Sequence, residues 1–173
     1  YTWGNGKYGR LGHNNHEESE LRPKYVFSFS NTHVRSVSCG HFVTFVVTRK
    51  GDLFGFGLTD DCRLGFTSPG EHKKRQRFVS KPVLLMKGRV ESVSAGLHHS
   101  LVLRRDPHHT GLRSVYACGL NTVGQCGVEF EDEEDNIGVE FERVCCDDDD
   151  DDRGDGRNVI SRCNTLKIIS TVC

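Results

Sequence analysis

The sequence predicts an all-β fold made of a repeated unit of short antiparallel strands. One glycine-rich phrase occurs three times, at residues 3–12, 56–65 and 118–127. A second segment occurs twice, because residues 34–40 match residues 90–96 in their valines, serines and closing glycine. A self-similar unit of this length is typical of an array of small modules, in which each copy buries its apolar face against its neighbours.

The elements of the second unit, expected at residues 21–66, follow one another in a simple order. Strands are expected at residues 34–40 and 42–48, the latter a run of Phe, Val and Thr. Gly51 then supplies the positive φ that a tight hairpin needs. The chain returns along residues 53–57 into the glycine-rich phrase, which closes the unit.

The third unit, expected at residues 81–128, repeats this order with one difference. Strands at 90–96 and 98–103 are followed by a return strand at 115–119. The hairpin between them, residues 104–114, is much longer than the tight turn of the preceding unit. Apolar residues occupy both faces of these strands, which predicts sheets packed face to face, and no segment predicts a helix.

These segments resemble the repeats of the regulator of chromosome condensation family. The family unit combines a V-x-x-V-x-x-G strand, a G-x-x-H-[ST] segment, a hairpin and a closing phrase similar to W-G-x-N-x-x-G-Q-L-G. Gly96 and His99 fit the second element, whereas Val43 stands at the histidine position of the preceding copy. Cys62 and Cys126 replace a glycine and a leucine of the closing phrase. The resemblance assigns structural roles to nine repeat positions: Gly4, Gly12, Gly40, Gly57, Gly65, Gly96, His99, Gly119 and Gly127.

The resemblance implies a β-propeller, in which four-stranded antiparallel blades surround a central channel. Repeats over residues 1–128 give two nearly complete blades and the end of a preceding unit at residues 1–20, and a further partial unit begins at 159–173. Because the sequence opens on the return strand of one unit and stops at Cys173, where the next glycine is expected, it is interpreted as a fragment of a longer member.

Charge divides the chain into two parts. Residues 1–128 carry 18 Lys and Arg against 9 Asp and Glu, whereas residues 129–173 carry 5 against 15. The acidic residues gather at 129–135 and in a run of six aspartates at 147–152. Like charges in such blocks repel one another and stay solvated, which predicts a disordered acidic insertion at residues 129–158. The alternative is a docking segment for a basic nuclear protein, such as a histone tail, or for an import factor.

A basic cluster between the second and third units comprises Lys73, Lys74, Arg75 and Arg77. It is interpreted either as a solvated loop between blades or as a patch that contacts an import receptor or nucleic acid. No aromatic residue alternates with these charges, so binding of single strands by base stacking is not indicated. Phosphate contacts through this loop are the remaining route to nucleic acid.

Cysteine and histidine spacing predicts neither a metal site nor a cofactor. None of the eight cysteines forms a C-x-x-C pair, and no histidine follows at zinc-finger spacing. We expect reduced thiols and a nuclear or cytoplasmic location. No stretch of about 20 apolar residues predicts a membrane span. His99 fills a structural repeat position, whereas His108 and His109 lie in the long hairpin.

The sequence does not predict an enzyme, because no set of residues supplies a nucleophile, a base and an orienting acid. The preferred interpretation is a non-catalytic propeller scaffold that binds other proteins. The alternative, implied by the family resemblance, is guanine-nucleotide exchange on a Ran-like small GTPase, by stabilisation of its nucleotide-free state. The long hairpin is the best local candidate for a partner contact. Its candidate residues are Arg104, Arg105, His108, His109 and Arg113.

Overall fold

The computed structural model describes residues 1–15, 17–66, 77–106, 111–128 and 139–143. Several of the predicted features lie outside these residues and are not considered further as structure. They are the basic residues Lys73, Lys74 and Arg75, the histidines His108 and His109, most of the acidic insertion, and the expected further unit at 159–173.

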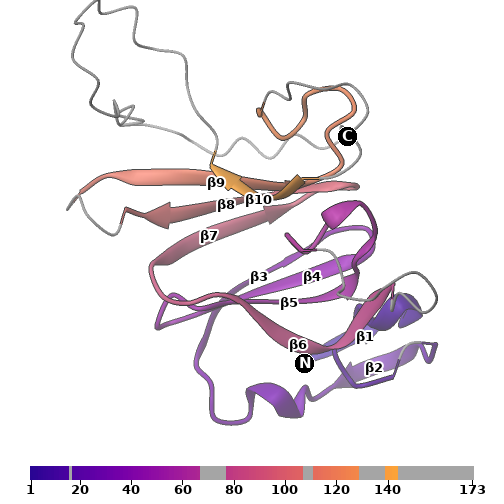
Figure 1. The fold of residues 1–173 in the computed structure, drawn as a ribbon. Coiled ribbons are helices and arrows are strands. Elements are labelled where there is room, and N and C mark those ends of the chain that lie inside the picture. The colour runs from indigo at the N-terminus through magenta and orange to yellow at the C-terminus, as the bar shows by residue number, and fades with distance from the viewer. Residues whose placement is uncertain (16, 67–76, 107–110, 129–138, 144–173) are drawn as a thin grey trace, which may run out of the picture.

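The described strands form three antiparallel sheets (Figure 1). The first sheet pairs β1 (Thr2–Gly4) with β2 (Glu20–Lys24). The second has the order β3 (Val34–Cys39), β4 (Val43–Thr48), β5 (Leu53–Leu58) and β6 (Phe78–Met86). The third has the order β7 (Val90–Ala95), β8 (His99–Arg105), β9 (Arg113–Gly119) and β10 (Val139–Arg143). The predicted all-β class and the four-stranded antiparallel sheets are therefore confirmed.

Helical structure in the described residues is limited to single 3-10 turns. They are η1 (Lys7–Gly9), η2 (Phe27–Phe29) and η3 (Asp60–Cys62). The turns η1 and η3 fall at the same place in two copies of the glycine-rich phrase. At that place the backbone of Tyr8 and Asp61 adopts positive φ, 63° and 55°. The phrase thus encodes a tight left-handed turn that directs the chain out of one sheet.

The fourth strand of each large sheet follows the glycine-rich phrase rather than preceding it. β6 is paired with β5 through Phe54–Leu84 and Gly55–Val83. β10 is likewise paired with β9, after the third phrase. A sheet is therefore offset by one strand from the sequence unit, and residues 81–86 of the expected third unit belong to the preceding sheet. Each unit consequently donates a strand to its neighbour's sheet.

The strand β10 lies inside residues 129–158, where the sequence predicts disorder. At residues 139–143 the structure differs from that expectation, because these residues pair with β9 from Gly119 to Tyr116. The segment V-E-F-E-R alternates apolar and charged residues, which is the pattern of a strand with one covered face. Phe141 packs against the core between the two large sheets. The surrounding charge obscures this short strand in the sequence.

The main core lies between the two four-stranded sheets, which pack face to face (Figure 1). All six residues of β4 are buried. Phe45 and Val47 have no exposed surface and meet Val90 and Val102 of the opposite sheet. The prediction that these strands are covered on both faces is correct for β4. Burial of such apolar side chains is the dominant favourable contribution to folding.

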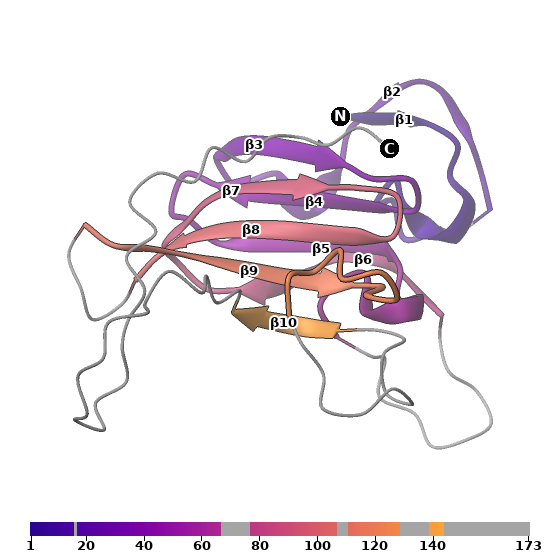
Figure 2. The same ribbon diagram turned by 90° about the horizontal axis from the view of Figure 1, so that it is seen from above.

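The turns and hairpins of the two sheets lie at opposite ends of the strands (Figure 2). At the hairpin end, Val90 donates to the Gly51 carbonyl at 3.0 Å and the Arg105 amide donates to the Arg89 carbonyl at 3.0 Å. The hairpin end comprises residues 49–52, 87–91, 104–106 and 111–113. At the turn end, the His41 amide donates to the Gly96 carbonyl at 3.4 Å. The turn end comprises residues 7–12, 40–42, 59–65, 96–98 and 120–127.

The glycine at the second position of the phrase is required by close approach at the turn end in two of the copies. Gly57 has a φ of +123°, and a Cβ added there would lie 2.2 Å from the Phe42 carbonyl oxygen. Gly119 has a φ of +112°, and its added Cβ would lie 2.3 Å from the His98 carbonyl oxygen. The two copies therefore need glycine for the same pair of reasons, positive φ and a neighbouring backbone.

Candidate protein-interaction surfaces

A carboxylate fixes the two arginines that frame the long hairpin. The Arg105 Nε donates to the Glu91 Oε1 at 2.5 Å, and the Arg113 Nε donates to the Glu91 Oε2 at 2.7 Å. These hydrogen bonds, from Arg105 first and then Arg113, lower the pKa of the Glu91 carboxyl. The arginine side chains remain 66% and 51% exposed. Glu91 therefore orients two guanidinium groups that still face solvent.

Neighbouring loops are tied to this hairpin through backbone carbonyls. The Arg104 Nη2 donates to the Lys87 carbonyl at 3.2 Å, and the Arg89 Nη1 donates to the Asp106 carbonyl at 3.2 Å. The Asp52 carboxylate accepts a hydrogen bond from the Gly88 amide at 2.8 Å. The loops of the two sheets are thus held as one unit at the hairpin end.

The hairpin end is strongly basic. Its acidic residues are Asp52, Glu91 and Asp106. Its basic residues, defined here as the basic surface, are Arg49, Lys50, Lys87, Arg89, Arg104, Arg105 and Arg113. All seven except the half-buried Arg104 are exposed. Counted as seven cations against three anions, the end carries a formal charge of +4.

The sequence predicted only the three arginines of the hairpin as candidates for this surface. The other four basic residues come from the β4–β5 hairpin and the β6–β7 connection, each of which looks like an ordinary solvated turn. Their adjacency depends on the packing of one sheet against the next. The sequence did contain a signal. Two turns that the repeat places at strand ends each carry two basic residues, Arg49–Lys50 and Lys87–Arg89.

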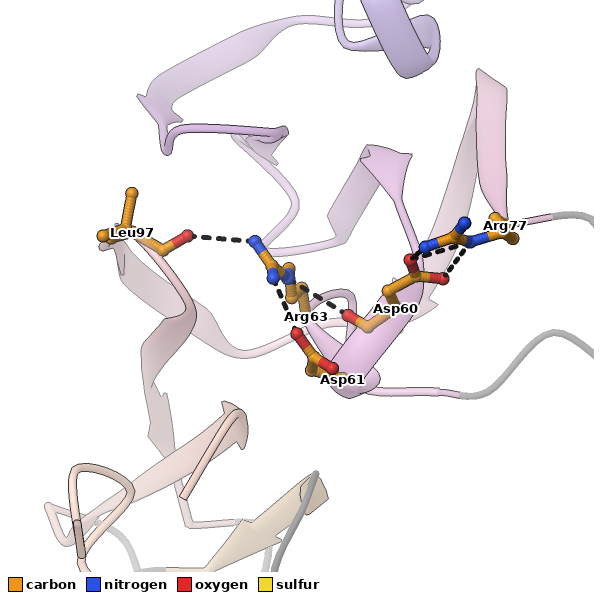
Figure 3. A network of polar contacts seen from close by, with 5 residues as sticks. All are labelled: Asp60, Asp61, Arg63, Arg77 and Leu97. Atoms are coloured by element: carbon orange, nitrogen blue, oxygen red, sulfur yellow. Dashed lines mark hydrogen bonds and ion pairs between the residues drawn. The ribbon is translucent and has the colours of Figure 1, made fainter. Parts of the chain in front are cut away.

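Arg77 lies at the turn end, where it pairs with Asp60 (Figure 3). Its Nε donates to both carboxylate oxygens of Asp60, at 2.9 Å and 3.1 Å. This pairing raises the pKa of Arg77. The structure therefore does not bring Arg77 together with Arg104, Arg105 and Arg113. The two predicted basic candidate sets belong to different ends of the strands wherever their residues are described.

A second arginine at the turn end joins the two large sheets (Figure 3). Arg63 is only 7% exposed. Its Nη1 donates to the Leu97 carbonyl at 3.3 Å, and its Nη2 meets the Asp61 carboxylate at 2.6 Å. The guanidinium also lies 5.4 Å from the centroid of the Phe42 ring, within range of a cation–π contact.

Arg10 makes the equivalent contact one unit earlier. Its Nη1 donates to the His41 carbonyl at 2.7 Å, and its guanidinium lies 4.9 Å from the Phe42 ring. Arg10 and Arg63 occupy the same place in the glycine-rich phrase, and His41 and Leu97 occupy the same place after the repeat glycine. The arginine of the phrase therefore joins its own sheet to the next one by a hydrogen bond to a backbone carbonyl. We call Arg10 and Arg63 the clasp arginines. Sequence reasoning missed this role, although the shared position was visible.

His99 begins β8 and is half-buried. Burial lowers its pKa below the ordinary histidine value. Its ring lies so close to Gly96 that a Cβ added at 96 would be 3.2 Å from the His99 Cε1. These contacts are consistent with the structural role that the repeat implies.

The described residues contain no group of three or more His, Cys, Asp or Glu side chains placed to hold a metal ion. Three cysteines, Cys62, Cys118 and Cys126, are buried. Burial raises the pKa of the Cys126 thiol to about 11 and that of Cys118 well above its usual value. Protonated thiols of this kind act as small apolar side chains. Among the described helices, none is long and apolar enough to cross a membrane.

Residues 1–47 match the family described as "Regulator of chromosome condensation (RCC1) repeat". The match covers the first phrase, the β3–β4 turn and most of β4. The remaining units repeat these elements with the same backbone requirements at Gly57 and Gly119.

The chain is an RCC1-repeat protein.

Two curated relatives extend the similarity beyond the matched residues. The serine/threonine-protein kinase Nek9 of Xenopus laevis is 30% identical over 161 residues, which is 84% of this chain and 16% of Nek9. The guanine nucleotide exchange factor SRM1 of Saccharomyces cerevisiae is 28% identical over 131 residues, 74% of this chain and 25% of SRM1. The chain thus spans a quarter or less of the length of these relatives.

The fold agrees with crystal structures of the yeast RCC1 protein Prp20. In the complex with Kap60 the TM-score is 0.59 at 22% identity, covering 84% of this chain and 32% of Prp20. A second structure, described with the binding of Prp20 to Gsp1p and histones, gives a TM-score of 0.53 at 23% identity, with 82% and 33% coverage. The two large sheets are therefore blades of an RCC1-type β-propeller, and β1–β2 is part of another.

Proposed function

We propose that this RCC1-repeat chain is a non-catalytic protein-interaction module whose basic surface binds an acidic partner protein. The observation that carries the proposal is the gathering of seven Lys and Arg side chains at one end of two adjacent blades, with Glu91 orienting Arg105 and Arg113. The family relatives support a nuclear or cytoplasmic location.

The chemistry of the surface favours carboxylate ligands. A guanidinium group presents planar N–H donors that match a carboxylate, and Arg105 and Arg113 display theirs on rigid strand ends. A concentrated positive field also accelerates encounter with an acidic partner and selects against basic ones. The propeller supplies the rigidity and its loops supply the contact, as in other scaffold-borne binding sites.

The test is binding of a fluorescein-labelled ten-residue polyglutamate peptide, followed by fluorescence anisotropy at low salt. The variant Lys50→Glu/Lys87→Glu changes two exposed residues of the basic surface without removing a side-chain hydrogen bond that orients the arginines. We expect it to weaken binding of the probe by about tenfold or more, because two lysine charges that attract the glutamates are reversed. The matched control, Lys7→Glu/Lys81→Glu, makes the same charge change away from the hairpin end. Equal weakening by both variants would reduce the effect to bulk charge and contradict the proposal.

A second candidate function is nucleotide exchange on a Ran-like small GTPase. The similarity to the exchange factor SRM1 over 74% of this chain favours it. Exchange requires a propeller surface that binds the nucleotide-free GTPase more tightly than the loaded form. The test is release of a fluorescent guanine nucleotide from a Ran-type GTPase. Acceleration by orders of magnitude, lost when residues 106–112 are replaced by a two-residue turn, would establish exchange in place of the scaffold role.

A further inference from the structure

We propose that the basic surface is also the docking site of the chain's own aspartate run, residues 147–152. The inference rests on the proposed role of the basic surface as a carboxylate-binding site. It adds an intramolecular occupant that an acidic partner must displace. Three observations support it: the direction of β10, the length of chain that follows it, and the match of charge.

The direction of β10 brings the chain to the hairpin end. β9 starts at Arg113 at the hairpin end and finishes at Gly119 at the turn end. β10 is antiparallel to β9, with Val139 opposite Gly119 and Arg143 opposite Tyr116. β10 therefore starts at the turn end and finishes toward the hairpin end. Figure 2 shows its arrow pointing to the same side as the β8–β9 hairpin.

The length of chain after β10 is sufficient for contact. Tyr116, the partner of Arg143, is three residues from Arg113 along β9, or about 10 Å at the usual strand rise of about 3.3 Å per residue. Asp147 follows Arg143 by four residue steps, which can span up to about 13 Å. The first aspartate is thus within chain reach of Arg113, and the five that follow extend the reach across Arg105 and Arg89.

The charges of the two groups are complementary. The basic end carries a formal charge of +4 in its described residues, and the run contributes six carboxylates. A short tether gives the run an effective concentration in the millimolar range at this surface, which favours even weak contacts. These contacts are exposed and are therefore screened by salt beyond about 10 Å at 0.1 M.

The chain contains its own matched comparison. Residues 129–135 also carry six carboxylates. They are bracketed by Val128, which follows the third phrase, and by Val139, which pairs with Gly119 at the turn end. Both anchors lie at the end opposite to the basic surface. The position of the chain, and not net charge alone, therefore selects the aspartate run as the occupant.

Zero-length coupling of carboxylates to amines tests the contact directly. The carbodiimide EDC joins aspartate to lysine as an amide, and Lys50 and Lys87 report on the hairpin end while Lys7 and Lys81 serve as exposed controls elsewhere. We expect peptides containing residues 147–152 to be linked to Lys50 and Lys87, with yields that fall severalfold in 1 M NaCl. Equal yields at Lys7 and Lys81, by mass spectrometry, would overturn the proposal.

Competition with the polyglutamate probe tests the consequence. Replacing all six aspartates of 147–152 by asparagine should tighten probe binding about five- to tenfold at low salt, because an internal competitor is removed. Replacing the six acidic residues of 129–135 by their amides makes the same charge change and should have much less effect. Equal tightening in both variants would overturn the proposal. Absence of probe binding in every variant would instead overturn the proposed function, while the cross-links would still decide the intramolecular contact.

Discussion

The strands β4 and β8 come from the same place in two copies of the repeat, yet they are buried differently. Every residue of β4 is buried. In β8 only Ser100 and Val102 are buried, and the others are half-buried or exposed. One face of β4 packs on the blade containing β7, and the other faces a cavity of about 610 Å³ lined in part by Tyr1 and Tyr25. β8 packs on one blade only among the described residues.

The difference shows that neighbours, and not the strand sequence, set the burial of a blade strand. Both strands carry apolar residues on two faces, as a strand between two blades requires. A substitution in β4 should therefore cost more than its repeat equivalent in β8. The same reasoning applies to the repeat glycines and the clasp arginines, whose copies differ in what surrounds them.

The largest difference in the loss of stability on substitution by alanine is expected between Phe45 and its repeat equivalent Leu101. Phe45→Ala should lower the free energy of unfolding by about 3–5 kcal/mol, because a fully buried ring leaves a cavity between two blades. Leu101→Ala, at a half-buried site, should cost about 2 kcal/mol or less. Urea unfolding followed by far-UV circular dichroism measures both. Similar losses would contradict the comparison.

The next largest difference in stability loss is expected between Gly57 and Gly4, which both stand at the second position of the phrase. Gly57→Ala combines positive φ with a 2.2 Å clash against the Phe42 carbonyl and should cost more than about 2 kcal/mol. Gly4→Ala keeps the unfavourable φ of +100° but meets nothing within 4 Å, so it should cost about 1–2 kcal/mol. The melting temperatures of the two variants give the order. If Gly4→Ala is the more damaging, close approach is not the reason for the repeat glycine.

The two clasp arginines should differ by their burial. Arg63→Ala leaves the Leu97 carbonyl and the Asp61 carboxylate without their buried donor and should cost about 2 kcal/mol. Arg10→Ala, at a more exposed site, should cost about 1 kcal/mol. Hydrogen exchange at the Gly96–His99 and Gly40–Val43 bonds localises the loss to the affected blade junction. Global loosening in both variants would argue against a local clasp.

The smallest effect concerns Glu91 and pH. Its pKa is lowered in the folded state from the ordinary value of 4.5, so its contribution to stability is complete above that value and is lost as pH falls through the lowered pKa. Because both arginine partners are more than half exposed, the contribution should be under about 1 kcal/mol.

Urea unfolding of the wild type and Glu91→Gln between about pH 6 and pH 3 checks this. The variant should be less stable than the wild type by up to about 1 kcal/mol near neutrality, and this difference should vanish as pH falls through the lowered pKa. Identical slopes of stability against pH would show that the Glu91 pair contributes nothing to folding.

Much of the fold was predictable because its signals are local. Six strands were expected within one or two residues of their observed positions, from runs of β-branched and aromatic residues between glycines. The strand β6 was not recognised, since it carries Lys81 and Pro82 and forms the edge of its sheet, where proline is tolerated. β10 was hidden by flanking acidic blocks. β6 pairs with β5, and β10 pairs with β9, across long intervening segments. Periodicity within one segment could not reveal these pairings.

The candidate surface was predicted less completely than the fold. Arg104, Arg105 and Arg113 share one hairpin, and the length of that hairpin singled them out. Arg49, Lys50, Lys87 and Arg89 join them only because two blades stack with their hairpins at one end. The role of Glu91 as a shared acceptor also depends on side chains that approach from two strands, β7 and β9, and from the end of β8.

The repeat and most strand and turn positions follow from the sequence alone, because local backbone conformation is encoded by neighbouring residues. Tertiary structure alone decided which strand is covered on both faces, which charges share an end, and where β10 delivers the chain. Those properties depend on how separate sheets pack and on the register between distant strands. A single alternating pattern fits several such arrangements, and only burial of apolar surface between particular blades selects one.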